Sequence, residues 1–156
     1  MTPRAWITAL PKNGVALAQR MGATHTINSA TEQLHESLQC ITRGLGPTVV
    51  IEAVGSPATY RAAVEEVAFT GRVVYIGYAK SDVSYTTKLF VQKELDIRGS
   101  RNAQPADFRA VIHYLQRGAC PTDELISAVV APEEASEAMQ QWASHPAKVF
   151  RILVKF

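Results

Sequence analysis

The chain has little cysteine, no long apolar run and almost no net charge. Cys40 and Cys120 stand alone, without a C-x-x-C pair or a histidine at ligand spacing, and are predicted to pack rather than bind metal. This argues against a disulfide-stabilised secreted domain and favours a cytoplasmic protein with reduced thiols. No apolar run approaches the roughly 20 residues of a membrane helix, and no signal peptide is expected. The net charge of +2 gives no argument for nucleic acid or an anionic membrane.

Two consecutive segments carry the most informative pattern, a β-branched run that ends in glycine. Residues 48–54 end at Gly55, and residues 72–76 end at Gly77. An apolar run, a turn of small residues and then a helix are typical of a buried parallel strand with a crossover helix. The sequence therefore predicts an α/β fold with a doubly wound sheet, in which ligands bind at the carboxyl ends of the strands.

The rest of the chain keeps this alternation of strand and helix. Ser29 with Glu32, and Ser56 with Pro57, are the predicted starts of two helices. Glu52 lies inside an apolar strand and is predicted to be a buried, hydrogen-bonded structural carboxylate. Further strands are predicted at 5–9, 24–27, 95–99, 126–130 and 148–155, and helices at 13–21, 29–44, 56–67, 87–94, 108–115 and 132–142.

Five stretches, in this order, resemble the C-terminal half of the medium-chain dehydrogenase/reductases, the zinc-type alcohol and polyol dehydrogenase family. They are residues 17–28, 49–57, 71–77, 93–100 and 148–156. The resemblance implies a Rossmann-like, doubly wound, mostly parallel sheet that is incomplete. The family's central first strand and its glycine-rich G-x-G-x-x-G turn have no counterpart here. The strands within residues 5–27 then lack their neighbour to the strand at 48–54, which leaves two open edges.

The family transfers hydride between an alcohol and NAD or NADP, with zinc as the Lewis acid that lowers the pKa of the alcohol. The resemblance implies that the catalytic zinc domain and the structural zinc loop are missing, so the chain alone is expected to be inactive. The stretch 99–103 is most similar to members that act on polyols and sugar acids. Residues 1–14 depart from the pattern and are predicted to form an atypical segment before a partial dinucleotide-binding domain, residues 15–156.

The resemblance also assigns cofactor-binding roles to the turns at the strand ends. The turn after the strand at 48–54 borders adenosine and ribose, and the next two turns reach the nicotinamide. A basic residue of the last strand contacts the pyrophosphate, which suits an arginine. Purely structural roles, a tight turn or a solvated charge, stay open for these positions. They are Val54, Gly55, Ser56, Ile76, Gly77, Tyr78, Ser100, Arg101, Asn102 and Arg151, with no catalytic or metal-binding residue among them.

Three interpretations of the chain follow. It is a truncated dehydrogenase that keeps a cofactor wall, a non-enzymatic binding or oligomerisation module, or one half of a split dehydrogenase completed by a chain with the zinc domain. Residues 95–99 and 127–130 are the expected edges of a homodimer. The expected partners are a nicotinamide cofactor and a small alcohol, without nucleic acid or membrane. Ala9, where the family usually has Asp, and Lys12 nearby would favour NADP over NAD if the local fold is intact.

Overall fold

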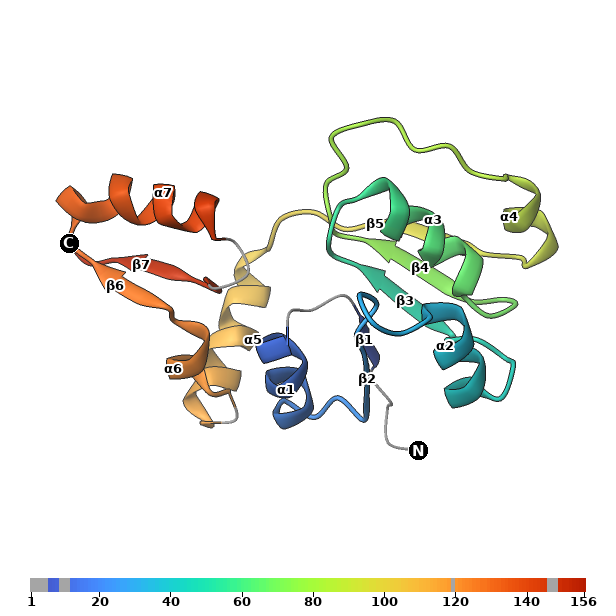
Figure 1. Cartoon of the computed structure of the whole chain (residues 1–156), viewed down its shortest axis with the longest axis horizontal. Helices are drawn as coiled ribbons and strands as arrows, with labels where there is room; N and C mark the ends of the chain where they lie inside the picture. Colours follow the sequence, from blue (N-terminus) through green and yellow to red (C-terminus); the bar gives the residue numbers. More distant parts are fainter. Residues whose placement is uncertain (1–5, 9–11, 119, 146–148) are drawn as a thin grey trace. The chain divides into compact units, whose positions relative to one another are not determined.

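The computed structural model describes residues 6–8, 12–118, 120–145 and 149–156, and it divides into two compact units, residues 1–102 and 103–156. Parallel strands alternate with helices in each unit, which confirms the predicted α/β class (Figure 1). The first unit contains β1 (Trp6–Thr8), α1 (Lys12–Arg20), β2 (His25–Ile27), α2 (Leu34–Thr42), β3 (Val49–Glu52), α3 (Pro57–Glu66), β4 (Arg72–Tyr75), α4 (Lys88–Gln92) and β5 (Asp96–Gly99). The second contains α5 (Pro105–Gln116), α6 (Thr122–Leu125), β6 (Ala128–Val130), the 3₁₀ helix η1 (Pro132–Glu134), α7 (Ala135–Ser144) and β7 (Ile152–Val154). The predicted boundary between residues 14 and 15 stays a prediction.

The described strands form three separate parallel sheets. β1 pairs with β2, β3 pairs with β4 and β4 with β5, and β6 pairs with β7. Neither β1 nor β2 is hydrogen-bonded to β3 in the part of the chain that the structure describes. The predicted interruption between the strands of residues 5–27 and the strand at 48–54 is therefore present, and β3 is an edge strand.

Helix α3 covers one face of the three-stranded sheet. Its start follows the local signals in the sequence, because the Ser56 hydroxyl accepts a hydrogen bond from the Thr59 N–H (3.2 Å) and Pro57 occupies the first turn. The buried cluster beneath it includes Val67 and Val73, which is fully inaccessible to solvent. This packing holds the carboxyl ends of β3 and β4 against the start of α3.

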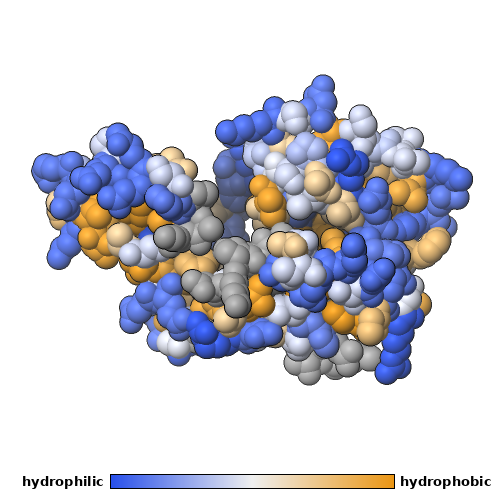
Figure 2. Space-filling view, in the orientation of Figure 1, coloured by the Kyte–Doolittle hydropathy of each residue, from blue (hydrophilic) through white to orange (hydrophobic). Residues whose placement is uncertain are grey.

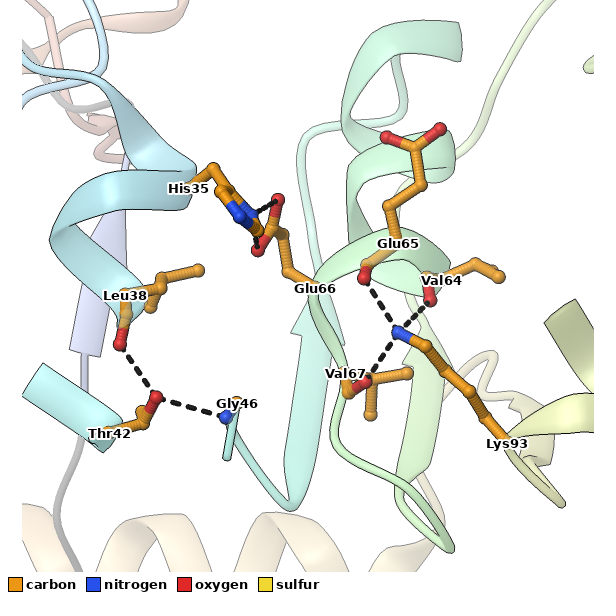
Figure 3. Close-up of polar contacts among 9 residues, drawn as sticks. All are labelled: His35, Leu38, Thr42, Gly46, Val64, Glu65, Glu66, Val67 and Lys93. Atoms are coloured by element: carbon orange, nitrogen blue, oxygen red, sulfur yellow. Dashed lines mark hydrogen bonds and ion pairs between the residues drawn. The ribbon is translucent and has the colours of Figure 1, made fainter. Parts of the chain in front are cut away.

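The end of α3 is held by a lysine from the loop before β5 (Figure 3). The Lys93 ammonium donates to the main-chain carbonyls of Glu65 (2.7 Å), Val67 (2.8 Å) and, more weakly, Val64 (3.4 Å). These carbonyls have no partner within the helix, and a cation at a helix C-terminus also interacts favourably with the helix dipole. Lys93 thus connects the end of α3 to the segment that leads into β5.

Two further contacts in Figure 3 connect α2 to its surroundings. The His35 ring nitrogen Nδ1 lies 3.0 Å from Glu66 at the end of α3. The Thr42 hydroxyl donates to the Leu38 carbonyl and accepts from the Gly46 N–H, which shapes the turn into β3. Both contacts help fix the crossover from β2 to β3.

Four details of the sequence-based prediction need correction. Helix α2 begins at Leu34 rather than at Ser29, because the Glu32 carboxylate accepts from the Asn28 N–H (2.8 Å) in a preceding turn. The described Cys40 side chain is exposed and not packed in the interior. The short helix α6 was not predicted. The last strand spans only Ile152–Val154, so residues 149–151 of the predicted strand are not strand, and its first residue, 148, lies outside the described part.

The C-terminal unit leaves much apolar surface open. Helix α5 has the predicted apolar stripe, but all four of its residues are exposed. Strand β6 and helix α7 also present large apolar side chains, and Figure 2 shows this apolar surface in the C-terminal unit. These exposed residues are Phe108, Val111, Ile112, Leu115, Val129, Met139, Leu153 and Val154. A two-stranded sheet with so much exposed apolar surface is poorly suited to stability on its own.

Candidate functional site

An open pocket of about 390 Å³ lies at the carboxyl ends of β4 and β5. Parallel strands bring the residues that follow them to the same edge of the sheet, so the segments 76–78 and 100–102 meet there. Six of the ten predicted positions line this pocket together with three residues that were not predicted. The lining residues are Tyr60, Tyr75, Ile76, Gly77, Tyr78, Gly99, Ser100, Arg101 and Asn102.

The floor of the pocket is a direct contact between two backbone turns. Gly55 has a φ of +79°, and a Cβ there would lie 2.6 Å from the Tyr78 nitrogen and 2.8 Å from its carbonyl carbon. A Cβ at Gly77 would in turn overlap the backbone of Gly55 and the Glu52 carboxylate. Only glycine fits at either position, so the turn after β3 fixes where Gly77 and Tyr78 lie.

Glu52 organises this pair of turns from below. Its Oε1 accepts hydrogen bonds from the N–H groups of Val54 and Gly55 (both 2.9 Å) and from the Thr59 hydroxyl (2.7 Å). Its Oε2 is buried and has no hydrogen-bond partner within the described residues. The predicted burial and hydrogen bonding of Glu52 are confirmed, and the saturated Oε1 holds the turn between β3 and α3 in place.

Tyr60 and Tyr75 line the pocket side by side, and Tyr85 contacts Tyr75 from outside the lining. The rings of Tyr60 and Tyr75 stack with their centroids 4.2 Å apart, and the Tyr60 hydroxyl donates to the Gly77 carbonyl. The Tyr85 hydroxyl donates to that of Tyr75, which donates in turn to the Tyr60 carbonyl (3.1 Å). The pKa of Tyr75 is raised well above its usual range, mainly by burial and to a smaller extent by the hydrogen bond with Tyr85. This phenol therefore stays neutral.

Arg101 lies at the exposed side of the pocket. Its guanidinium carbon is 5.7 Å from the centre of the Tyr78 ring, within range of a cation–π interaction. The next residue, Asn102, has a φ of +63°, a conformation that asparagine tolerates better than most residues. This bend directs the chain away from the sheet directly after the pocket.

The other predicted positions lie outside the lining. Val54, Gly55 and Ser56 form the turn beneath the pocket and the cap of α3, so their contribution to it is indirect. Arg151 belongs to the C-terminal unit, where its carbonyl accepts from the Ser127 N–H (2.8 Å). Gly99 was within reach of sequence reasoning, because it ends the strand that precedes Ser100. Tyr60 and Tyr75 had no local signal, since they reach the pocket through helix packing and strand register.

Metal binding has no support in the described residues. No group of three or more His, Cys, Asp or Glu side chains in that part of the chain is placed to hold a metal ion. The described side chains therefore do not fit a zinc centre. No helix in the same residues is long and apolar enough to cross a membrane.

A parallel sheet with a pocket at the carboxyl ends of its strands is typical of ligand-binding α/β proteins. The chain belongs to the zinc-binding dehydrogenase family, whose model matches residues 6–117. The family assignment and the Rossmann-like fold expected from the sequence are thus confirmed.

Two relatives of known name are dehydrogenases of a polyol or a polyol phosphate. D-arabitol-phosphate dehydrogenase of Enterococcus avium is 30% identical over 128 residues, 81% of this chain and 36% of that protein. Sorbitol dehydrogenase of Bacillus subtilis is 25% identical over 152 residues, 95% of this chain and 42% of that protein. The chain therefore spans less than half the length of these relatives.

Solved structures show the same fold. A short chain alcohol dehydrogenase from E. coli CFT073, in complex with NADH, superimposes with a TM-score of 0.85 at 23% identity, covering 98% of this chain and 44% of that one. L-idonate 5-dehydrogenase from E. coli K-12 gives a TM-score of 0.84 at 19% identity, covering 98% and 43%. The likeness extends over nearly the whole of this chain and less than half of either neighbour.

Proposed function

We propose that this chain forms the nicotinamide-facing part of an NAD(P) site in a zinc-type alcohol dehydrogenase. The observation that carries the proposal is the pocket at the ends of β4 and β5, where Gly77, Tyr78, Ser100 and Asn102 lie together. These are positions that the resemblance assigns to nicotinamide binding. The reaction is hydride transfer between NAD(P) and a secondary alcohol, a polyol or a sugar acid, in keeping with relatives named for arabitol phosphate and sorbitol.

The pocket suits a flat aromatic ring with a polar substituent. Gly77 lines this space, and its missing side chain leaves room for the Gly55 turn that lies beneath it. The Gly77 carbonyl is oriented by the Tyr60 hydroxyl, and backbone groups of the segments 76–78 and 100–102 border the same space. Backbone groups held this rigidly are good partners for a carboxamide, whose orientation decides which face of the ring reacts.

We further propose that the chain alone does not turn over an alcohol. In this chemistry zinc is the Lewis acid that lowers the pKa of the alcohol. The described residues offer no set of zinc ligands, and the chain spans only 36% to 42% of the two curated relatives. A location in the cytoplasm, with both thiols reduced, fits a protein that uses the cellular nicotinamide pool.

The test is a thermal melt of the purified chain with and without NAD, NADP and their reduced forms. A ligand that binds only the folded state stabilises it by about 2.7 kcal/mol at roughly 100 times its Kd. We expect one cofactor to raise the melting temperature, which would also decide between NAD and NADP. The Tyr78→Ala variant should lose this shift, whereas Tyr114→Ala, an exposed tyrosine of α5, should keep it.

A melt that no cofactor changes, in a chain that still unfolds cooperatively, would contradict the proposed binding site. Turnover of sorbitol by the purified chain with added zinc would contradict the proposed inactivity. The two results are independent, because cofactor binding needs only the pocket and turnover needs the metal.

One observation favours a second candidate, completion by another polypeptide that carries the zinc domain. β3 is an edge strand whose Val49 and Ile51 are half or more exposed, although strands inside parallel sheets are normally buried on both faces. An open parallel edge with apolar side chains is a template for a further strand. We propose that this edge is paired in the working protein, by a complementing chain or by a second copy in a homodimer.

Size-exclusion chromatography distinguishes these arrangements. The chain alone should elute as a defined dimer if copies pair with one another. If a separate chain completes it, coexpression with the unmatched part of the Enterococcus avium relative should give a one-to-one complex. Elution as a monomer in both experiments would contradict both arrangements.

A further inference from the structure

Arg101 is the cationic side chain of the pocket, and it has no anionic partner in the described part of the chain. The ion pairs found there involve His35, Arg72 and Arg98, and the contact that the Arg101 guanidinium makes within those residues is with the face of Tyr78. Arg101 is exposed and lines the pocket. A charged group at a pocket with no internal partner is available for a ligand.

The neighbouring arginines of the same sheet show what a structural arginine looks like here. Arg72 and Arg98 both donate to Asp96, at 2.7 Å and 3.0 Å; the bond from Arg72 connects β4 to β5, and the bond from Arg98 lies within β5. Arg101 comes only three residues after Arg98 but lies beyond the end of the strand. Arg72 and Arg98 thus have an anionic structural partner within the described residues, whereas Arg101 has none.

The Arg101 guanidinium lies over the Tyr78 ring, 5.7 Å from its centre, and its N–H groups are available for an anion. A guanidinium that lies over a ring keeps its N–H groups free at its edge, because they point outward in its own plane. Two parallel N–H groups match the oxygens of a phosphate or a carboxylate.

The rest of the lining is compatible with an anion. No Asp or Glu is among the lining residues, and Ser100 and Asn102 add polar side chains on either side of Arg101. The nearby carboxylate of Glu52 lies under Gly77 and is not part of the surface. The phenol of Tyr75 is neutral because its pKa is raised. No negative charge of the lining therefore opposes a second one brought by a ligand.

We propose that Arg101 binds the anionic group of the substrate, a phosphate or a carboxylate, and so selects sugar phosphates or sugar acids over neutral polyols. This inference rests on the proposed function, since it places the substrate beside the nicotinamide end of the pocket. It replaces the cofactor-binding role that the resemblance gives Arg101 with a role in substrate binding: the affinity for NADH should not depend on the charge of Arg101.

The experiment measures binding to the full chain by ligand-observed NMR, with and without saturating NADH. The probes are sorbitol 6-phosphate, gluconate and sorbitol, which share a polyol chain and differ in charge. We expect the phosphate, the carboxylate or both to bind about tenfold more tightly than sorbitol, the size of one charge-assisted contact. The anionic probe whose affinity exceeds that of sorbitol by the larger factor identifies which anion the site binds.

Three variants make the result specific. Arg101→Met should reduce the preference for the anionic probe to less than about twofold, and Arg101→Lys should keep part of it, since a lysine retains the charge without the fork. Lys80→Met removes an exposed cation just outside the lining and should leave the preference intact. The melting temperatures of all three should stay close to that of the parent, because Arg101 has no structural partner.

The outcomes separate this inference from the proposed function. If NADH does not bind but the anion preference exists and disappears in Arg101→Met, Arg101 is an anion site and the proposed cofactor site beside it fails. If NADH binds but no probe binds, or the preference survives in Arg101→Met, the inference is wrong and the cofactor site stands. A loss of NADH affinity in Arg101→Met with an unchanged anion preference would assign Arg101 to the cofactor and overturn the proposal.

Discussion

The two faces of the three-stranded sheet are built from equally apolar strands but differ in what covers them. On one face, Val50 and Val73 lie in register under α3, and Val73 has no exposed surface. On the other face, Val49 is 50% and Ile51 is 62% exposed. Alternate residues of the same β-branched runs therefore meet very different surroundings. The sequence pattern of a doubly buried strand is present, but only one face is buried in this chain.

This difference separates the packed part of the sheet from the part whose apolar side chains are exposed. The covered face holds α3, the turn at Gly55 and the floor of the pocket in one packed arrangement. The open face and the free edge of β3 contribute nothing to that arrangement. The function proposed for the pocket thus depends on the covered face, whereas the assembly proposed with further polypeptide depends on the open face and the free edge of β3.

The largest effect is expected at the turn that joins the sheet to α3. Gly55→Ala should lower the free energy of unfolding by about 3 kcal/mol, because the new Cβ meets the Tyr78 backbone and the left-handed φ disfavours alanine. Urea unfolding followed by circular dichroism measures the change. Gly22→Ala is the control, since Gly22 also has a positive φ but no atom within 4 Å of an added Cβ, and it should cost only about 1 kcal/mol. Equal losses in the two variants would contradict the close contact with Tyr78.

The second prediction compares the same substitution on the two faces. Val73→Ala should cost about 2 kcal/mol, from two lost methyl groups and the cavity left between β4 and α3. Val49→Ala should cost at most about 0.5 kcal/mol, because half of that side chain is already exposed. Similar losses at both positions, measured by the same urea titration, would mean that the open face is covered in solution.

Much of the covered face could be predicted because its signals are local. The β-branched runs gave β3 and β4 to within one or two residues, and Ser56 with Pro57 gave the start of α3. The same reasoning was wrong at Ser29, because the Glu32 side chain there closes a turn onto Asn28 instead of opening a helix. A capping pattern shows which bonds a segment can make, but not whether a helix follows.

The pocket was only partly predictable, for a physical reason. Gly77, Ser100 and Arg101 directly follow strands, so their place at the edge of the sheet follows from the topology. Tyr60 and Tyr75 enter the pocket because α3 packs on β4 in one particular register, and no local pattern contains that information. Nor does the sequence separate Arg101, which has no anionic partner within the described residues, from Arg98, which is paired with Asp96.

The third prediction concerns the lysine that fastens α3 to the sheet. Lys93→Met should lower the free energy of unfolding by about 1.5 kcal/mol, because the carbonyls at the end of α3 lose their charged donor. Lys88→Met, at an exposed position of α4, should change it by less than about 0.5 kcal/mol. Hydrogen exchange should show faster opening of the last turn of α3 in Lys93→Met only. An unchanged exchange rate there would remove Lys93 from the support of the covered face.

The smallest effect is expected on the open face, where Asp96 pairs with Arg98 and Arg72. Hydrogen bonds from these two arginines lower the pKa of Asp96 below its usual range. A carboxyl group with a lowered pKa in the folded state stabilises that state at neutral pH. This contribution fades as the pH falls below the ordinary range of aspartate, about 4, and through the lowered value.

Asp96→Asn should therefore reduce stability slightly at pH 7 and in low salt, and not at all near pH 2. The difference should also shrink at 1 M salt, because the pair is exposed and screened. Urea midpoints of the parent and the variant at the two pH values measure it. A large loss at pH 7 that survives in high salt would mean that this ion pair is shielded from water. The open face would then be covered by another polypeptide, and its contrast with the face under α3 would no longer hold.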